Sequence, residues 1–343
     1  MKNIVQSNFH ITIAATVTGE QDVVQQVEHV LNATKVALLY ADNVTLYSTA
    51  VNFINPLLTI THLNQKQKIN LLELILPTMC VAQPEKASSY KSIISELKLL
   101  NKHNLQGSEI ERRKIVQSTF EVSWKEIQQK LVEFRHQNKI TEFETVVSKG
   151  VLDLRPLGSP LNEVEQLASW LIDEPVMSPS GSLIEPADDK KRIHSMVHDF
   201  SQIMQQMLNS KNSYPLFDQM TGDFVNNGLK AGWFSVSELQ VSRAKHSKLA
   251  SEMIRRLPSF ESATIEELLD IKTELGSPLI RFRRAMMEYS KTMSTVAWGS
   301  DFEIEAEEIY LEKFQTALLE IDEAVRSNKY LMKLVSKLFA SPL

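Results

Sequence analysis

The chain has 343 residues, of which 43% are hydrophobic and 23% charged, and it contains one cysteine, Cys80. This composition is typical of a folded protein with its own core, and a lone cysteine excludes a scaffold held by internal disulfides. The net charge is −5. Residues 1–150 carry 16 Lys+Arg against 14 Asp+Glu, and the rest carries 21 against 28, so neither part has the basic excess of a dedicated nucleic-acid-binding module.

Signals for a membrane or for export are not apparent in the sequence. The richest apolar run, residues 71–82, is interrupted by Glu73 and Pro77 and is shorter than the ~20 residues of a membrane span. Polar residues near the N-terminus break up the apolar core that a signal peptide needs. We therefore expect a cytoplasmic protein with no membrane partner.

Residues 9–47 predict a β-α-β unit. Apolar residues alternate with polar ones from Phe9 onward, as in a strand, and apolar residues then recur every three or four positions over 23–31, as in a helix. Residues 36–47 are rich in β-branched and aromatic side chains, which favours one bent strand or a tight hairpin. Within this run Asp42 is interpreted as a turn residue, with the catalytic acid of a βα nuclease as the alternative.

Between residues 49 and 140 the pattern becomes helical. Ser108 and Glu111 have the spacing of a capping box, in which two side chains bind the free amides at a helix start. The helix that follows is predicted to bury one apolar stripe, formed by Val116, Phe120, Trp124, Ile127, Leu131 and Phe134.

A segment rich in proline divides the chain. Residues 151–187 contain five prolines, which break regular elements, so we predict a connector between domains at 1–150 and 188–343. In the second domain Thr264 with Glu267 has capping-box spacing, and Ser277-Pro278 predicts another helix start. The expected fold is α+β and predominantly α-helical, with a small N-terminal βαβ-like layer followed by a C-terminal helical bundle.

The end of the chain has the clearest helical pattern. From Leu311 to Phe339 apolar residues return every three or four positions, with Asn328 in one slot. Such a stripe must be buried against another helix or a partner chain. We predict that it packs on the helix that carries Phe282 and Met286, with a homodimer seam, its register set by Asn328, as the alternative.

Strong catalytic motifs are missing, including a Gly-rich phosphate loop, a paired CxxC and HExxH. Arg192 and His198 have the R-x5-H spacing of HEPN-type ribonucleases, where such a pair would polarise phosphate and move a proton. Six residues turn a helix by about 600°, which leaves these side chains ~120° apart. Asp188 also offers Arg192 an ordinary ion pair. His194 and His198 face the same side of a helix and are the best metal candidates, but no third ligand accompanies them.

A basic cluster near the C-terminus is the candidate binding surface. It comprises Arg281, Arg283, Arg284, Arg255 and Arg256. Such a cluster can hold phosphate, as in nucleic acid, or an acidic partner. The alternative, which we favour, is internal pairing, of Arg284 with Glu288 and of Arg281 with an acidic helix nearby. The obvious acidic surface is residues 301–323, where nine carboxylates accompany one lysine.

Two segments carry a resemblance. Residues 38–46 read Leu-Leu-Tyr-Ala-Asp-Asn-Val-Thr-Leu, and residues 257–286 include Thr-Ile-Glu-Glu-Leu-Leu-Asp-Ile-Lys-Thr-Glu-Leu-Gly-Ser-Pro. With the acidic segment that follows, they resemble a group of uncharacterised bacterial proteins. The resemblance covers a minor part of the chain and implies a bacterial source, but no activity, cofactor or catalytic residue.

These patterns favour a protein that acts through helical surfaces. We predict a non-enzymatic interaction or scaffold protein with a protein partner or self-association and with no cofactor. The alternative is a nucleic-acid-binding protein or HEPN-like ribonuclease in a bacterial defence or toxin role. A third hypothesis, small-molecule sensing in a pocket between the two halves, rests on no motif.

Overall fold

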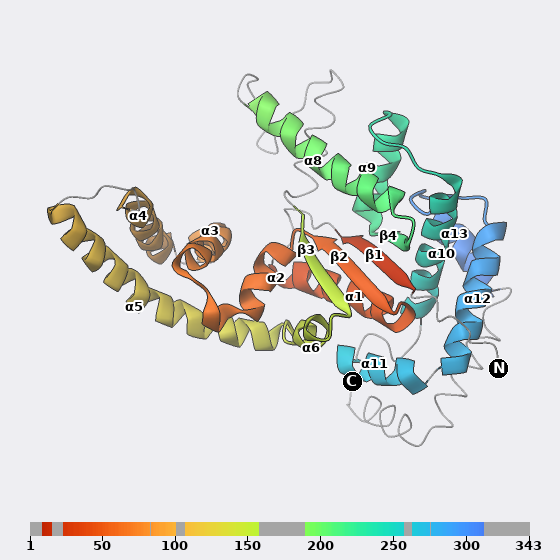
Figure 1. Cartoon of the computed structure of the whole chain (residues 1–343), viewed down its shortest axis with the longest axis horizontal. Helices are drawn as coiled ribbons and strands as arrows, with labels where there is room; N and C mark the ends of the chain where they lie inside the picture. The colour runs from red at the N-terminus through yellow and green to blue at the C-terminus, as the bar shows by residue number, and fades with distance from the viewer. Residues whose placement is uncertain are drawn as a thin grey trace. The chain divides into compact units, whose positions relative to one another are not determined.

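A computed structural model describes residues 9–15, 23–82, 84–100, 107–157, 189–256, 263–274 and 276–311. The chain divides into two compact units, one made of residues 1–51 and 142–343 and the other of residues 52–141. The fold is α+β and mostly helical, with a small parallel sheet in the first unit, as the sequence predicts (Figure 1).

The sheet has four parallel strands in the order β3-β2-β1-β4. These are β1 (His10–Ala15), β2 (Asn43–Ser48), β3 (Leu152–Pro156) and β4 (Ser213–Phe217). Strand β3 comes from the first residues of the predicted connector, and β4 comes from the predicted C-terminal bundle. Segments far apart in the chain therefore meet in one sheet, beside the expected N-terminal strands.

Alternation along the strands gives the sheet one apolar and one polar face. Side chains of the apolar face, such as Ile11, Ile13 and Leu46, are almost completely buried. Helix α1 (Val23–Tyr40) packs against β1 and β2, and α10 (Glu238–Arg255) packs against β4. The polar face contributes several residues to the candidate site.

The prediction of a strand over residues 36–40 is wrong, because these residues form the last turns of α1. The helix is buried on nearly every side from Ala33 to Ala41, so no polar face marks its period in the sequence. Even Lys35 is 1% exposed, and its Nζ lies 3.9 Å from Glu142 Oε2. The strand begins after this helix, at Asn43.

Six further helices complete the described part of the first unit. They are α6 (Glu142–Ser148), α8 (Asp189–Asn209), α9 (Gln219–Lys230), α11 (Ile265–Glu274), α12 (Gly276–Thr292) and α13 (Phe302–Ile309). The capping box at Thr264 and Glu267 is confirmed, with reciprocal amide bonds of 2.8 and 3.2 Å. Helix α12 begins at Gly276, before the predicted Ser277-Pro278 start.

The second unit is helical throughout its regular elements. It contains α2 (Val51–Leu58, apart from its first residue), a 3-10 turn (Ile60–His62), α3 (Gln65–Ala82), α4 (Pro84–Leu100) and α5 (Ser108–Gln137). Helix α5 buries Val116, Phe120, Trp124 and Ile127 of the predicted stripe, whereas Leu131 and Phe134 are half-buried. The capping prediction there is wrong, because Gly107 occupies the N-cap position and no side chain caps the helix.

Two sequence predictions fall largely outside the described residues. Of the apolar stripe from Leu311 to Phe339, only its first residue is described, and the connector is described only as far as residue 157. Phe282 and Met286 are buried, with the Phe282 ring 5.8 Å from that of Tyr40. Within the described part of the chain, no helix combines the length and apolar character needed to cross a bilayer.

Candidate functional site

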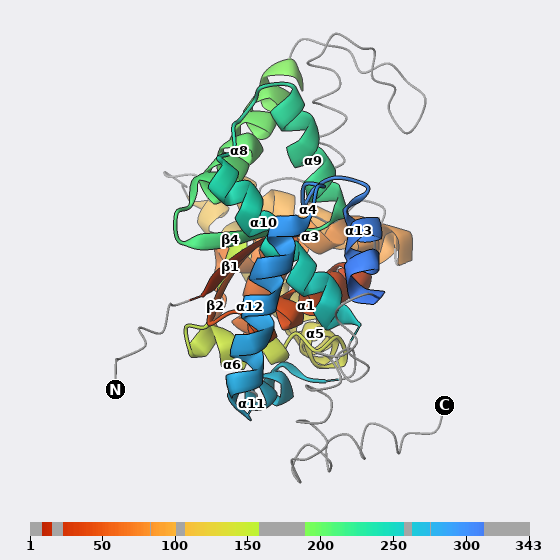
Figure 2. The same ribbon diagram turned by 90° about the vertical axis from the view of Figure 1, so that its right-hand side faces the viewer.

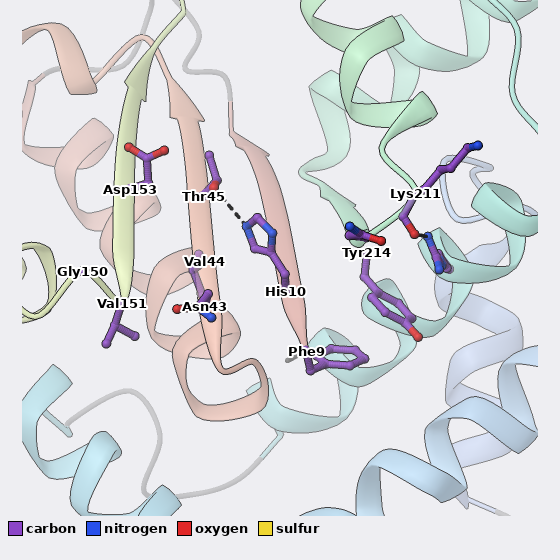
Figure 3. A pocket seen from close by; sticks show the side chains of 12 residues that line it. Phe9, His10, Asn43, Val44, Thr45, Gly150, Val151, Asp153, Lys211 and Tyr214 are labelled. Atoms are coloured by element: carbon purple, nitrogen blue, oxygen red, sulfur yellow. Dashed lines mark hydrogen bonds between the residues drawn. The ribbon is translucent and has the colours of Figure 1, made fainter. Parts of the chain in front are cut away.

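A cavity of about 590 Å³ lies at the amino edge of the sheet, where the strands begin. Its lining comes from four separate stretches of chain and from α10. The lining residues are Phe9, His10, Asn43, Val44, Thr45, Gly150, Val151, Asp153, Lys211, Asn212, Tyr214 and Arg243 (Figure 3). The volume falls within the ~300–1,000 Å³ range of small-molecule sites.

Strand register brings the polar members of this lining together. In a parallel sheet, residues paired across strands point to the same face. Thr45 pairs with Thr12 on one side and with Asp153 on the other, and His10 lies two residues before Thr12. His10, Thr45 and Asp153 therefore share the polar face, and His10 Nε2 lies 3.0 Å from Thr45 Oγ1 in a hydrogen bond (Figure 3).

The surroundings of His10 favour its neutral form. Burial lowers the pKa of this imidazole below its ordinary value of 6.5, and the positive charge of Arg155 lowers it further, while Asp153 acts in the opposite direction. Asp153 is itself engaged by Arg155, whose Nε lies 2.7 Å from its carboxylate. A neutral imidazole beside a hydroxyl can accept or donate a hydrogen bond to a ligand, and it can take up a proton.

The opposite end of the cavity carries positive charge. Arg243 donates from Nη1 to the carbonyl of Lys211, and its guanidinium carbon lies 5.3 Å from the centre of the Tyr214 ring. Gln240 also donates to a carbonyl of this turn, that of Ser210. These bonds from α10 fix the chain just before β4, and the Lys211 side chain is exposed.

The lining as a whole favours a small polar anion. Two cations, Lys211 and Arg243, belong to the lining beside one carboxylate, Asp153, which already pairs with Arg155. No group of three His, Cys, Asp or Glu side chains suited to a metal ion occurs among the described residues. The remaining polar groups supply hydrogen bonds rather than charge.

The candidate catalytic and metal residues lie on α8, away from this lining. His198 is exposed and its Nε2 lies 2.8 Å from Nε2 of Gln202, one turn further along. Arg192 and His194 belong to the same helix, and their side chains are outside the described part. The ribonuclease and metal hypotheses therefore stay predictions.

The basic cluster is divided among different surroundings. Arg256 pairs with Glu307 and lies 4.6 Å from the Tyr310 ring centre, which is the internal pairing that we favoured. Arg255, Arg281 and Arg284 are exposed, and none of them lines the cavity.

Arg283 turns inward and binds the end of α1. Its Nε lies 2.7 Å from the Tyr40 carbonyl and its Nη2 lies 3.1 Å from Asp42 Oδ1. Asp42 Oδ2 in turn accepts a 2.9 Å hydrogen bond from the Phe9 amide. Asp42 thus ties the turn after α1 to the start of β1, in agreement with its interpretation as a turn residue.

Sequence reasoning did not single out His10, Asp153, Lys211 or Arg243. A weak signal existed, because polar residues alternate with apolar ones in His10-Ile-Thr-Ile and in Leu152-Asp-Leu-Arg. Alternation predicts a polar sheet face but not which strands are neighbours.

The chain was compared with models of protein families, with curated proteins and with solved structures, and none of the three comparisons found a match.

Proposed function

We propose that this protein binds a small, negatively charged polar molecule in the cavity at the amino edge of the sheet. The observation that carries the proposal is the convergence of His10, Thr45 and Asp153 from three neighbouring strands with Lys211 and Arg243 at the other end. The third sequence hypothesis, a pocket between the two halves, is of this kind, since the lining comes from both predicted domains.

The two ends of the cavity suit different parts of one ligand. Lys211 and Arg243 favour an anionic group such as a phosphate or carboxylate. His10, Thr45 and Asn43 lie on the strands beside them and offer donors and acceptors to hydroxyl or amide groups. A ligand with an anionic end and a hydrogen-bonding body meets both requirements.

Isothermal titration calorimetry of the full chain tests the proposal, with inorganic phosphate, glycerol 3-phosphate and succinate as probes. We expect at least one probe to bind, and Lys211→Gln to weaken its binding by about tenfold, the value of one charge-assisted hydrogen bond. Lys230→Gln is the matched control, because Lys230 is also exposed but lies at the end of α9, outside the lining. Binding that is unaffected by Lys211→Gln, or no binding of any probe, refutes the proposal.

The interaction prediction concerns a different part of the molecule. The exposed arginines of α12 lie outside the cavity, so this prediction can be tested separately.

A further inference from the structure

The outward side of α12 is an exposed strip in which apolar and basic residues alternate. It consists of Ile280, Arg284, Met287 and Lys291, which are spaced so that all four lie on one side of the helix. Ile280 is 59% and Met287 41% exposed, large values for such side chains. We call these four residues the α12 face.

The outward side of α13 has the corresponding acidic pattern. It consists of Asp301, just before the helix, Ile304 and Glu308 within it, and Leu311 just after it. Ile304 is 63% and Leu311 57% exposed. We call these four residues the α13 face.

The charges of both faces are available for pairing. Neighbouring carboxylates of α13 are already engaged, Glu303 by Lys248 and Glu307 by Arg256. By contrast, Arg284, Lys291 and Glu308 take part in no ion pair among the described residues, and all three are exposed.

The two faces match when the helices run in opposite directions. Arg284 then lies opposite Glu308, with the apolar pairs Ile280–Leu311 and Met287–Ile304 on either side. Lys291 reaches Asp301 in the same register. The lengths agree as well, because at 1.5 Å per residue the α12 face spans about 16 Å and the α13 face about 15 Å.

One molecule carries both faces, each on a helix of the first unit. Helices α12 and α13 both pack against α10, and two views show them close together (Figures 1 and 2). A molecule with two complementary faces can bind a second copy through a twofold axis, so that each complementary pair is formed twice.

We propose that this chain forms a symmetric dimer in which the α12 face of each copy docks on the α13 face of the other. The exposed apolar pairs on either side supply the driving force, and the Arg284–Glu308 pair between them sets direction and register. The contact is short, which places it at the weak end of specific interfaces and makes the association reversible. This dimer does not depend on the cavity or on its ligand.

Sedimentation velocity of the full chain, from micromolar concentration to several hundred micromolar, tests the dimer. We expect the sedimentation coefficient to rise with concentration. Arg284→Glu places two like charges in each contact and should raise the dissociation constant at least about tenfold. Arg284→Glu combined with Glu308→Arg restores opposite charges and should recover most of the affinity.

Lys125→Glu is the matched control, because Lys125 is an exposed cation on α5, in the other unit. It makes the same change in net charge and should leave the dimer intact. Met287→Asp removes the apolar contact and should abolish association while circular dichroism shows an intact fold. A chain that sediments as a monomer at every concentration, a dimer that survives Arg284→Glu, or a double variant that does not recover would each overturn the proposal.

Discussion

A buried histidine should make this protein sensitive to mild acid. His246 on α10 is 4% exposed, and its Nε2 lies 2.5 Å from the hydroxyl of Tyr40. Burial, together with the nearby positive charge of Arg283, lowers the pKa of His246 to about 4. Burial also raises the pKa of Tyr40, so its hydroxyl stays protonated and can donate to the neutral imidazole. A protonated imidazole could not accept that hydrogen bond.

The free-energy change follows from the difference in pKa between the folded and unfolded chains. The folded value is about 4, and the ordinary value is 6.5. Because the folded pKa is the lower one, the unfolded chain binds more protons between these values, and stability falls as the pH drops through that window. The full loss is about 3 kcal/mol, of which about 2 kcal/mol is reached by about pH 5.

Urea unfolding at about pH 7.5 and about pH 5 measures this loss. His246→Asn keeps a group that can accept from Tyr40 but removes the titration. Between the two pH values the wild type should lose about 2 kcal/mol more unfolding free energy than His246→Asn, because the other titrating groups are common to both chains. Equal losses in the two proteins would show that His246 is not the acid-sensitive group.

Three further perturbations have outcomes that the structure determines. Asp42→Ala removes the carboxylate that binds the Phe9 amide and Arg283, and should lower the unfolding free energy by about 2–3 kcal/mol in urea titrations, whereas a loss below half a kilocalorie would contradict the role of this group. Burial lowers the pKa of Lys272 from its ordinary value of 10.5 to about 8, so the unfolded chain binds more protons between these two values. Between about pH 7 and about pH 9.5 the unfolding free energy of the wild type should therefore rise by about 2 kcal/mol more than that of Lys272→Met, and parallel curves would refute this. Gly228→Ala would drive a Cβ into the buried Phe234 ring and should cost about 1–3 kcal/mol in thermal or urea unfolding, while Gly276→Ala, which meets open space, should cost less than the Gly228 variant.

The sequence predicted the fold where a local pattern decides the structure. Thr264 and Glu267 form the expected capping box because both partners lie within one helical turn, and Trp124 is buried because its stripe has a simple period. The end of α1 was mistaken for a strand for the opposite reason. Its residues are buried on all sides, and neither the helical nor the strand period can then be recognised.

The candidate site could not be predicted because it depends on strand order. His10, Asp153 and Lys211 are separated by long stretches of chain. They line one cavity only because β3 and β4 join the β1–β2 pair in a single sheet. The arginine cluster shows a related limit. Arg281 and Arg284 are exposed, but Arg283 between them points inward to the carbonyl of Tyr40. One sequence position decides which side of the helix an arginine occupies.

The position of the cavity departs from the usual arrangement in open parallel sheets, where ligands bind at the carboxyl ends of the strands, beside the point where strand order reverses. Here β1 is flanked by β2 and β4, so that point lies between β1 and β4. At the carboxyl edge of the sheet, the first residue after β4 is Asp218. Its carboxylate accepts a hydrogen bond from the Thr221 amide at 2.9 Å and lies 3.0 Å from His29 Nε2. A carboxylate there opposes an anion, whereas the amino edge offers Lys211 and Arg243. If an anion does bind this protein, Lys211→Gln should therefore weaken its binding and His29→Gln should not, and the reverse result would move the site to the carboxyl edge.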